Sequence, residues 1–280
     1  MKKNKNIFLG KKILIYGLGK SGISSFKFLK DKAKIFLFDD NLKKHHKIID
    51  FKKLLKINFD VIIISPGIDK SNCKLSKFLK KNSKKIYTDL DVFYSFFKNP
   101  SIAITGTNGK STTAKILYDI LLAHKKDVRL VGNIGNPVLS EKRINEKTIF
   151  VIEVSSYQLD YSKVFSSKYA IILNISIDHI ERHKSLKNYI NAKFKLISSQ
   201  NKKCIAFVKK DDEFINKKLK SFNFSSKVVR VDTKKNYKIY NHINNKNFLT
   251  ENNKENLSFV FELSKKLKLK NRLLLRTIQK

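Results

Sequence analysis

The sequence has 280 residues, of which 41% are hydrophobic, and its formal net charge is +37 at pH 7. This length allows two domains of ordinary size, and the hydrophobic fraction is normal for a globular protein. No apolar run approaches the ~20 residues that a membrane-spanning helix requires. Lysines interrupt the apolar residues after the basic N-terminus, which argues against a secretory signal. We therefore expect a cytoplasmic protein without membrane insertion.

The large positive charge raises the alternative of a nucleic-acid-binding protein. However, the basic residues are almost all Lys, with only six Arg, and they are spread along the whole chain. Arg is the residue expected for bidentate recognition of phosphates and bases. We therefore predict a lysine-coated surface that binds no nucleic acid but attracts anionic substrates. The two cysteines, Cys73 and Cys204, are isolated, which argues against a disulfide framework and a cysteine-rich zinc site.

Short, β-branched apolar runs alternate with segments of helical periodicity along the chain. The predicted strands are residues 12–16, 34–38, 61–65, 101–105, 148–154, 169–175 and 203–208. The clearest predicted helices are residues 21–30, 111–124 and 186–199. Several runs are apolar throughout, as parallel strands buried on both faces are. The alternation predicts an α/β fold with mainly parallel sheets.

Two glycine-rich turns, at 17–22 and 106–111, each follow a predicted strand and precede a predicted helix. They suggest two successive doubly wound units. The boundary is expected near residues 98–100, where Asn99-Pro100 breaks the preceding helix. We predict a Rossmann-like domain at 1–98 and a P-loop-type ATP-binding domain at 99–280. The Asn-rich stretch 233–248 is predicted to be a hairpin or loop without chemistry.

The second glycine-rich turn lies in the sequence TGTNGKST at 105–112 and has the context of a phosphate loop. Gly106 and Gly109 allow backbone amides to approach phosphate oxygens, and the start of the helix adds partial positive charge. Lys110 supplies a full positive charge to the β- and γ-phosphates, and Ser111 offers a hydroxyl to Mg²⁺. The pattern therefore predicts ATP and Mg²⁺ binding, against the alternative of a fortuitous turn before a helix.

Polar residues follow two further predicted strands. Glu153 ends one of them, where a carboxylate of an open α/β sheet points into the ligand crevice, so it is a candidate Mg²⁺ ligand. The alternative for Glu153 is a helix cap. His179 follows the next strand in the same relative place and is a candidate for contacting metal or phosphate, against a purely structural role. His183 suggests a two-histidine metal site, which its basic neighbours disfavour.

The first glycine-rich turn, GLGKSG at 17–22, fits the dinucleotide fingerprint G-x-G-x-x-G. Asp39 follows about 20 residues later at the end of the next strand, as that fingerprint requires. The physical requirement is a pyrophosphate at a helix N-terminus and an acid near a ribose or base, which a UDP-sugar meets as well as NAD does. Ser65-Pro66-Gly67 adds a second loop at the same sheet edge.

Taken in order, these motifs resemble those of the muramyl ligases over essentially the whole chain. The motifs that carry the resemblance are GLGKSGIS at 17–24, SPG at 65–67, TGTNGKST at 105–112, GNIGNP at 132–137, EVSSYQLD at 153–160, NISIDHIERHKSLKNYINAK at 174–193 and NNKEN at 252–256. The first two point to the glutamate-adding member. The last departs from the family because Asn252 replaces the usual His.

The resemblance implies an ATP- and Mg²⁺-dependent ligase that adds D-glutamate to UDP-N-acetylmuramoyl-L-alanine in peptidoglycan biosynthesis. The L-alanine carboxylate takes the γ-phosphoryl group, and the D-glutamate amine then displaces phosphate from the acyl phosphate. The implied catalytic residues are Lys110, His179 and Lys193. The implied ATP-binding residues are Gly106, Thr107, Asn108, Gly109, Lys110, Ser111, Thr112 and, at the adenine, Asn256.

The resemblance also implies metal ligands and substrate contacts. Ser111 and Glu153 would hold one Mg²⁺, and His179 and a carbamylated Lys193 would serve a second. The residues implied to border the UDP are Gly17, Gly19, Ser21, Gly22, Asp39, Ser65, Pro66 and Gly67. Those implied around the muramoyl-alanine are Asn133, Ser155 and Gln158. We expect a monomer.

Members of this family have a third, C-terminal domain that binds D-glutamate, which we expect to be absent from this chain. Residues 263–280 look like a unit that is interrupted rather than finished. We therefore expect the chain to bind the UDP substrate, to bind ATP weakly and to ligate poorly or not at all. The alternatives are another muramyl ligase, a non-catalytic UDP-substrate-binding remnant and an NAD-linked oxidoreductase, which leaves the second glycine-rich turn unexplained.

Overall fold

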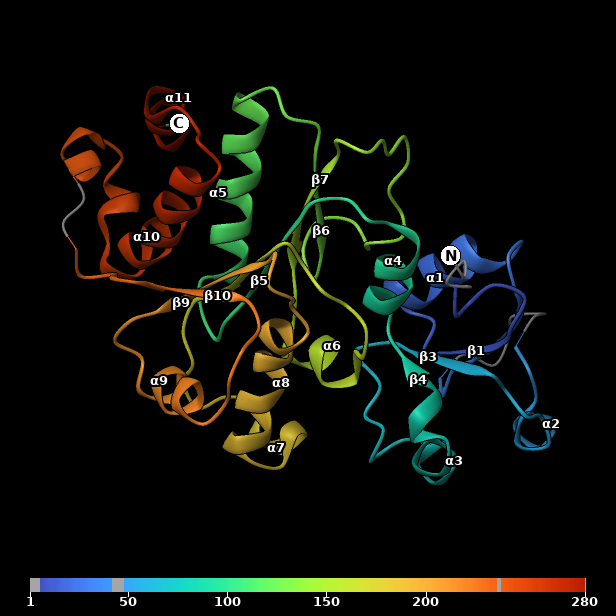
Figure 1. The fold of residues 1–280 in the computed structure, drawn as a ribbon. Helices are drawn as coiled ribbons and strands as arrows, with labels where there is room; N and C mark the ends of the chain where they lie inside the picture. The colour runs from blue at the N-terminus through green and yellow to red at the C-terminus, as the bar shows by residue number, and fades with distance from the viewer. Residues whose placement is uncertain (1–5, 42–47, 236–237, 280) are drawn as a thin grey trace. The chain divides into compact units, whose positions relative to one another are not determined.

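The computed structural model describes residues 6–41, 48–235 and 238–279. The chain divides into two compact units (Figure 1). The first unit contains Met1–Lys98, Pro137–Lys142 and Tyr157–Phe165, and the second contains Asn99–Asn136, Arg143–Ser156 and Ser166–Lys280. Two short segments from beyond residue 99 therefore belong to the first unit, and a single division of the chain does not describe this arrangement.

Each unit is built on a parallel sheet flanked by helices, which confirms the predicted α/β fold class. Within the described part of the first unit, the sheet has the strand order β2-β1-β3-β4. Its strands are β1 Lys12–Tyr16, β2 Lys34–Phe38, β3 Val61–Ile64 and β4 Ile86–Tyr87. Its helices are α1 Lys20–Leu29, α2 Phe51–Leu55, α3 Ser76–Lys81, the 3-10 helix η1 Ser83–Lys85, α4 Asp89–Phe96 and most of α6 Ser156–Tyr161.

The first sheet is buried on both faces, because its strands are apolar at successive positions. Leu14 of β1 and Ile62 of β3 pack with Leu54 of α2 and Leu79 of α3 in one buried cluster. The alternate residues of these strands, such as Ile13, are equally buried and face the other side. The sheet is thereby fixed in its core, and its carboxyl edge carries the loops that follow β1, β2 and β3.

The second sheet has the order β10-β9-β8-β5-β7-β6 among the described residues, and its paired strands are all parallel. Its strands are β5 Ser101–Thr105, β6 Val128–Gly132, β7 Ile149–Glu153, β8 Tyr169–Ile172, β9 Ile205–Lys209 and β10 Lys227–Val231. The helices of this unit are α5 Lys110–Ala123, α7 Ile180–His183, α8 Leu186–Ser198, α9 Glu213–Lys220, η2 Lys238–His242, η3 Lys246–Leu249, α10 Glu251–Lys266 and α11 Asn271–Ile278.

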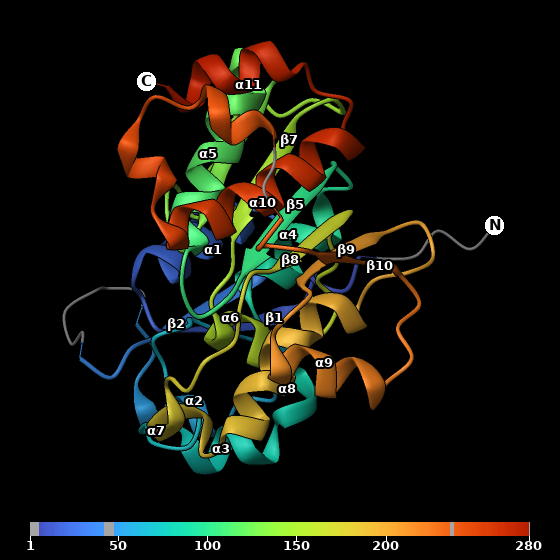
Figure 2. The same ribbon diagram turned by 90° about the vertical axis from the view of Figure 1, so that its left-hand side faces the viewer.

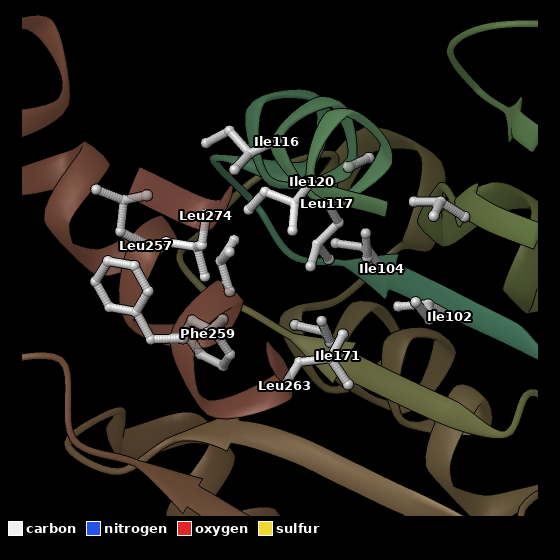
Figure 3. Packing of buried hydrophobic residues seen from close by; sticks show 14 of the residues in the cluster. Ile102, Ile104, Ile116, Leu117, Ile120, Ile171, Leu257, Phe259, Leu263 and Leu274 are labelled. Carbon is white, nitrogen blue, oxygen red and sulfur yellow. The ribbon is translucent and has the colours of Figure 1, made fainter. Parts of the chain in front are cut away.

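One face of the second sheet is covered by α5, α10 and α11, which lie side by side (Figure 2). Ile104 of β5 and Ile171 of β8 meet Leu117 of α5, Leu263 of α10 and Leu274 of α11 in a shared core (Figure 3). The segment after residue 250 therefore packs as two amphipathic helices on α5. No helix among the described residues has the length and apolar character needed to cross a membrane.

The stretch 233–248, predicted to be a hairpin or loop, forms no hairpin among its described residues. Its described residues contain the short 3-10 helix η2 and most of η3, while residues 236–237 lie outside the described part of the chain. The Tyr240 hydroxyl donates to the backbone oxygen of Lys254 at 3.0 Å, and Ile243 is buried in the core under α10. Burial of these apolar side chains, rather than strand pairing, organises this segment.

Candidate active site

The phosphate-loop sequence forms a tight turn between β5 and α5. Gly109 caps α5 with a φ of 81°, in the left-handed region that favours glycine. A Cβ atom at Gly109 would lie 2.1 Å from Oδ1 of Asn256, which is buried directly against the turn. The backbone N–H of Asn108 donates to Asn174 Oδ1 at 2.9 Å, so the loop after β8 braces the same turn. Asn256, far from the phosphate loop in the sequence, therefore packs directly against it in the fold.

Two lysine amines converge on this turn. Lys110 Nζ donates to the carbonyl oxygens of Thr107 at 2.8 Å and Gly106 at 3.1 Å, and Lys193 Nζ donates to Gly106 at 2.7 Å. Burial and the neighbouring charge of Lys110 lower the pKa of Lys193 to about 7, although Asp178 opposes this shift. Burial also lowers the pKa of Lys110. Two partly or fully buried lysine side chains therefore line the turn.

Glu153 lies at the end of β7 and contacts two other predicted site residues. Its Oε2 accepts a hydrogen bond from Ser111 Oγ at 2.8 Å, and its Oε1 accepts one from Asn133 Nδ2 at 2.7 Å. The Asn133 N–H also donates to the Glu153 carbonyl oxygen at 2.9 Å, which fixes the loop after β6 against β7. The Glu153 side chain is buried, so its carboxylate is held in one orientation.

The donor set around Glu153 suits Mg²⁺. This ion prefers hard oxygen ligands and is usually bound by one or two carboxylates together with substrate phosphates, rather than by an all-protein cage. A carboxylate beside the Ser111 hydroxyl, at the turn lined by Lys110, meets that description. Among the described residues no three or more His, Cys, Asp or Glu side chains are grouped so that they could hold a metal ion, so these residues offer no such cage.

His179 precedes α7 in a left-handed conformation, with a φ of 52°. Its Nε2 lies 3.4 Å from Asp178 Oδ2, and its ring packs edge-on against Tyr189 with the centroids 6.2 Å apart. Lys193 Nζ lies 4.5 Å from the centroid of the same Tyr189 ring, and the Tyr189 hydroxyl is 3.1 Å from Thr107 Oγ1. Tyr189 therefore links His179 and Lys193 to the phosphate loop.

Tyr189 is a residue that the sequence analysis did not identify. The available signal was its position four residues before Lys193 on a helix, which places the two side chains on one face. His183 packs on the same ring at 5.3 Å and its Nε2 is 3.0 Å from Ser156 Oγ. Of the other predicted residues, Thr112 is exposed near the start of α5, and Ser155 is half-buried between β7 and α6.

The first glycine-rich turn is closely packed from within its own unit. A Cβ atom at Gly22 would lie 1.9 Å from the carbonyl oxygen of Gly17, and Gly17 itself has a φ of 89°. Ser65 Oγ donates to that carbonyl oxygen at 2.7 Å, so the loop after β3 supports the turn. Gly19 and Gly67 are exposed and meet no atom within 4 Å of a Cβ, so they are not needed for packing. Pro66 is half-buried.

A carboxylate holds the backbone of this turn. Asp39 accepts from the Leu18 N–H through Oδ2 at 2.7 Å and from the Asn41 N–H through Oδ1 at 2.9 Å. Asp89, which the sequence analysis did not identify, is buried, and its Oδ1 accepts from the Leu90 N–H at 3.0 Å. Burial raises the pKa of Asp89, although the neighbouring polar groups oppose the shift.

A cavity of about 370 Å³ lies beside the first turn. Its lining includes Leu18 and Lys20 of the turn, Lys27 of α1 and Pro137 from the short segment that joins this unit. Two lysines beside the N-terminus of a helix make the cavity suitable for an anionic group.

Residues 104–274, more than half of the chain, match the Mur ligase middle domain family. The chain is 36% identical to the UDP-N-acetylmuramoylalanine–D-glutamate ligase of Rickettsia bellii over 71% of this chain and 46% of that protein. It is 36% identical to the ligase of the same name from Elusimicrobium minutum over 84% of this chain and 56% of that protein. The chain thus spans about half the length of the curated relatives that it matches.

Two solved structures share the fold. The UDP-N-acetylmuramate:L-alanyl-gamma-D-glutamyl-meso-diaminopimelate ligase of Neisseria meningitides has a TM-score of 0.63 at 12% identity, covering 96% of this chain and 98% of that one. The UDP-N-acetylmuramate-alanine ligase of Thermotoga maritima has a TM-score of 0.51 at 18% identity, covering 96% of this chain and 68% of that one. The predicted resemblance is therefore confirmed, and the chain belongs to the Mur ligase family.

Proposed function

We propose that this chain supplies the UDP-substrate-binding and ATP-binding parts of a ligase that adds D-glutamate to UDP-N-acetylmuramoyl-L-alanine. The observation that carries the proposal is the phosphate loop of the second unit, where two amines and the Ser111–Glu153 pair converge. The similarity to named D-glutamate ligases supports this choice of acceptor and amino acid. The cytoplasmic location and the monomeric state expected from the sequence remain predictions.

In this proposal Lys110 turns from the carbonyl oxygens of Gly106 and Thr107 to the β- and γ-phosphate oxygens of ATP. Ser111 and Glu153 would hold Mg²⁺, which when bound would neutralise charge on the transferring phosphoryl group. Catalysis of this kind depends on positioning and on electrostatic stabilisation more than on covalent chemistry by the protein. The bracing of the turn by Asn174 and Asn256 provides the rigidity that such positioning needs.

Lys193 is suited to carbamylation. A pKa of about 7 leaves a large neutral fraction of the amine at neutral pH, and only the neutral amine can add CO₂. The neutral amine nitrogen would bond to the carbon of CO₂ and release one proton, which converts a neutral amine into an anionic carbamate. Such an oxygen donor, together with His179, would serve the second Mg²⁺ implied by the family resemblance.

Calorimetry on the purified chain tests the proposal. We expect UDP-N-acetylmuramoyl-L-alanine to bind, ATP with Mg²⁺ to bind more weakly, and NADH not to bind. Glu153→Gln should weaken ATP binding only when Mg²⁺ is present, because the variant removes a metal ligand and not a phosphate contact. Binding of NADH without binding of the UDP substrate would refute the proposal in favour of an oxidoreductase.

A turnover assay separates a ligase from a binding remnant. With ATP, Mg²⁺ and D-glutamate present, the assay compares phosphate release by this chain with and without the UDP substrate. Phosphate release that depends on the UDP substrate and is lost in Lys110→Met supports the ligase. UDP-substrate binding with no phosphate release above that of Lys110→Met supports the non-catalytic remnant.

A further inference from the structure

Helices α8 and α9 of the second unit lie side by side, and a cavity of about 480 Å³ lies between them (Figures 1 and 2). Leu186 and Ile190 of α8 and Phe214 of α9 provide its apolar walls. Small-molecule sites typically have a volume of about 300–1,000 Å³ and a largely apolar lining with a few polar groups, which this cavity matches. None of its described lining residues is one that we assign to ATP or to the UDP substrate. The cavity is therefore a candidate site for a further ligand.

Lysines dominate the charge of this cavity. Lys187 of α8 and Lys217 and Lys218 of α9 line it, and Glu213 is the only carboxylate among its described lining residues. Lys187 and Lys217 are exposed, and Lys218 Nζ lies 5.9 Å from the centroid of the exposed Phe222 ring. Apolar walls beside an excess of cations suit a ligand with an apolar body and one anionic group, since burying the body and attracting the anion are both favourable. A small apolar carboxylate meets this description.

The α8 wall of the cavity is connected to the phosphate loop. Tyr189 and Lys193 are buried residues of the same helix, and they contact that loop instead of lining the cavity. The Tyr189 hydroxyl lies 3.1 Å from Thr107 Oγ1, and Lys193 Nζ donates to the Gly106 carbonyl oxygen at 2.7 Å. A displacement of α8 would therefore alter its contacts with two residues of the phosphate loop.

The α9 wall is connected to the same loop by a different route. Asp212 is the buried N-cap of α9, and its Oδ2 accepts from the Ile175 N–H at 2.8 Å. The next residue, Ser176, donates its N–H to Thr107 Oγ1 at 3.0 Å. Both helices that line the cavity are thus joined to the phosphate loop through hydrogen bonds.

We propose that the cavity between α8 and α9 is an effector site for a small apolar carboxylate, whose binding tightens the binding of ATP at the phosphate loop. The effect on ATP rests on the proposed function. An occupant that contacts both helices restricts their motion relative to each other, so less conformational entropy is lost when ATP orders the loop. Because such coupling is reciprocal, ATP must tighten the binding of the carboxylate by the same factor.

Decanoate, used below its micelle concentration, is the probe for this site. In calorimetry on the purified chain we expect decanoate to bind at a single site. Decylamine has the same tail with a cationic head, and it should bind about tenfold more weakly because the lysines repel it. Acetate has the anionic group without the tail, so its binding should be too weak to detect.

Two lysine variants on α9 form a matched pair. Lys217→Gln removes a charge from the cavity lining and should weaken decanoate binding about threefold, the effect of one exposed charge. Lys220→Gln removes the same charge from an exposed residue that does not line the cavity, and it should leave the affinity unchanged. Ser221→Trp, at an exposed lining residue, should fill the cavity and abolish decanoate binding.

Titration of ATP with Mg²⁺ tests the coupling. Saturating decanoate should lower the Kd of ATP about fivefold, and saturating ATP should lower the Kd of decanoate by the same factor. Both effects should be lost in Ser221→Trp. Hydrogen exchange supplies a readout that needs no ATP. Decanoate should slow the exchange of amides in residues 186–193 and 213–220 of the wild-type chain, and it should not do so in Ser221→Trp.

Three results would each overturn the inference. These are decanoate binding no tighter than that of decylamine, equal losses of affinity in Lys217→Gln and Lys220→Gln, and an ATP Kd that decanoate leaves unchanged. If the wild-type chain binds no ATP, the proposed function fails, and hydrogen exchange then decides separately on the cavity. Slower exchange of both helices with decanoate supports the ligand site, and unchanged exchange refutes it.

Discussion

The two glycine-rich turns share a backbone plan but differ in the charge that surrounds them. Each follows a buried parallel strand and precedes a helix. Each also contains a glycine at which an added Cβ atom would clash with a neighbouring atom. In the first unit a carboxylate accepts from the turn, with Asp39 on the Leu18 N–H. In the second unit amines donate to the turn, from Lys110 and Lys193.

The difference teaches that the glycine pattern specifies the backbone, whereas side chains from distant segments specify the ligand. In the first turn the Leu18 N–H is already bound to Asp39, so that amide is not offered to a pyrophosphate. In the second turn two buried amines are positioned to bind an anion. A polyphosphate therefore suits the second turn better than the first.

The largest expected effect concerns the packing of the first turn. Gly22→Ala should lower the free energy of unfolding by about 3 kcal/mol, because its Cβ would lie 1.9 Å from a backbone oxygen that cannot move independently. Gly19→Ala is the control and should change stability by less than about 0.5 kcal/mol, since nothing lies within 4 Å of its Cβ. Urea unfolding measures both. Equal stabilities would show that the turn is not as tightly closed as described.

A pair of lysine substitutions tests the contrast in charge. Lys110→Met should weaken ATP binding about 30-fold, which corresponds to about 2 kcal/mol for lost charge-assisted hydrogen bonds. Lys20→Met in the first turn should leave ATP binding unchanged and weaken the UDP substrate about threefold, because that lysine is exposed. Calorimetric titration of each variant with both ligands is the measurement. Equal loss of ATP affinity in the two variants would remove the contrast.

The smallest effect is a dependence of stability on pH. Burial and the neighbouring charge of Lys110 lower the pKa of Lys193 to about 7 in the folded chain, although Asp178 opposes this shift. Above pH 7 the unfolded state therefore binds more protons at this residue than the folded state, so stability rises with pH. Lys193→Met should flatten the rise by about 1 kcal/mol per pH unit between pH 7 and 9.

Urea unfolding at several pH values measures this slope, and Lys195→Met, on the same helix, is the control. A wild-type slope that survives unchanged in Lys193→Met would mean that the buried amine keeps its ordinary pKa. In that case the carbamylation proposal would lose its chemical basis.

Much of the fold could be predicted because its central strands are short, apolar and buried on both faces. Strands β1, β2 and β5 have the predicted bounds. The edge strands β10 and β6 were not predicted. Lys227 and Arg230 interrupt the apolar pattern of β10, and Arg129 interrupts that of β6. At such positions one side of the strand meets solvent, so the periodicity that identifies a buried strand is lost.

The candidate site was predictable where one short motif contains the chemistry and unpredictable where contacts come from distant segments. The turn with Lys110 and Ser111 is visible in the sequence because a strand, glycines and a helix follow one another. Lys193 was one lysine among many until packing buried it against Gly106. Asp89 gave no signal, because a carboxylate in the first turn of a helix is ordinarily an exposed, favourable charge.

The distribution of the first unit over three segments of the chain limits how recombination can exchange it. Three segments of each unit alternate, so the chain passes between the units five times. An exchange of residues 1–98 for the corresponding part of another protein would remove Asp91 but leave residues 162–165 in place. The Ser162 hydroxyl and the Phe165 N–H, which donate to the Asp91 carboxylate, would then lose their acceptor. Recombination at one junction therefore cannot exchange the whole first unit. A substitution in residues 1–98 must instead be compatible with residues 137–142 and 157–165, which belong to the same unit.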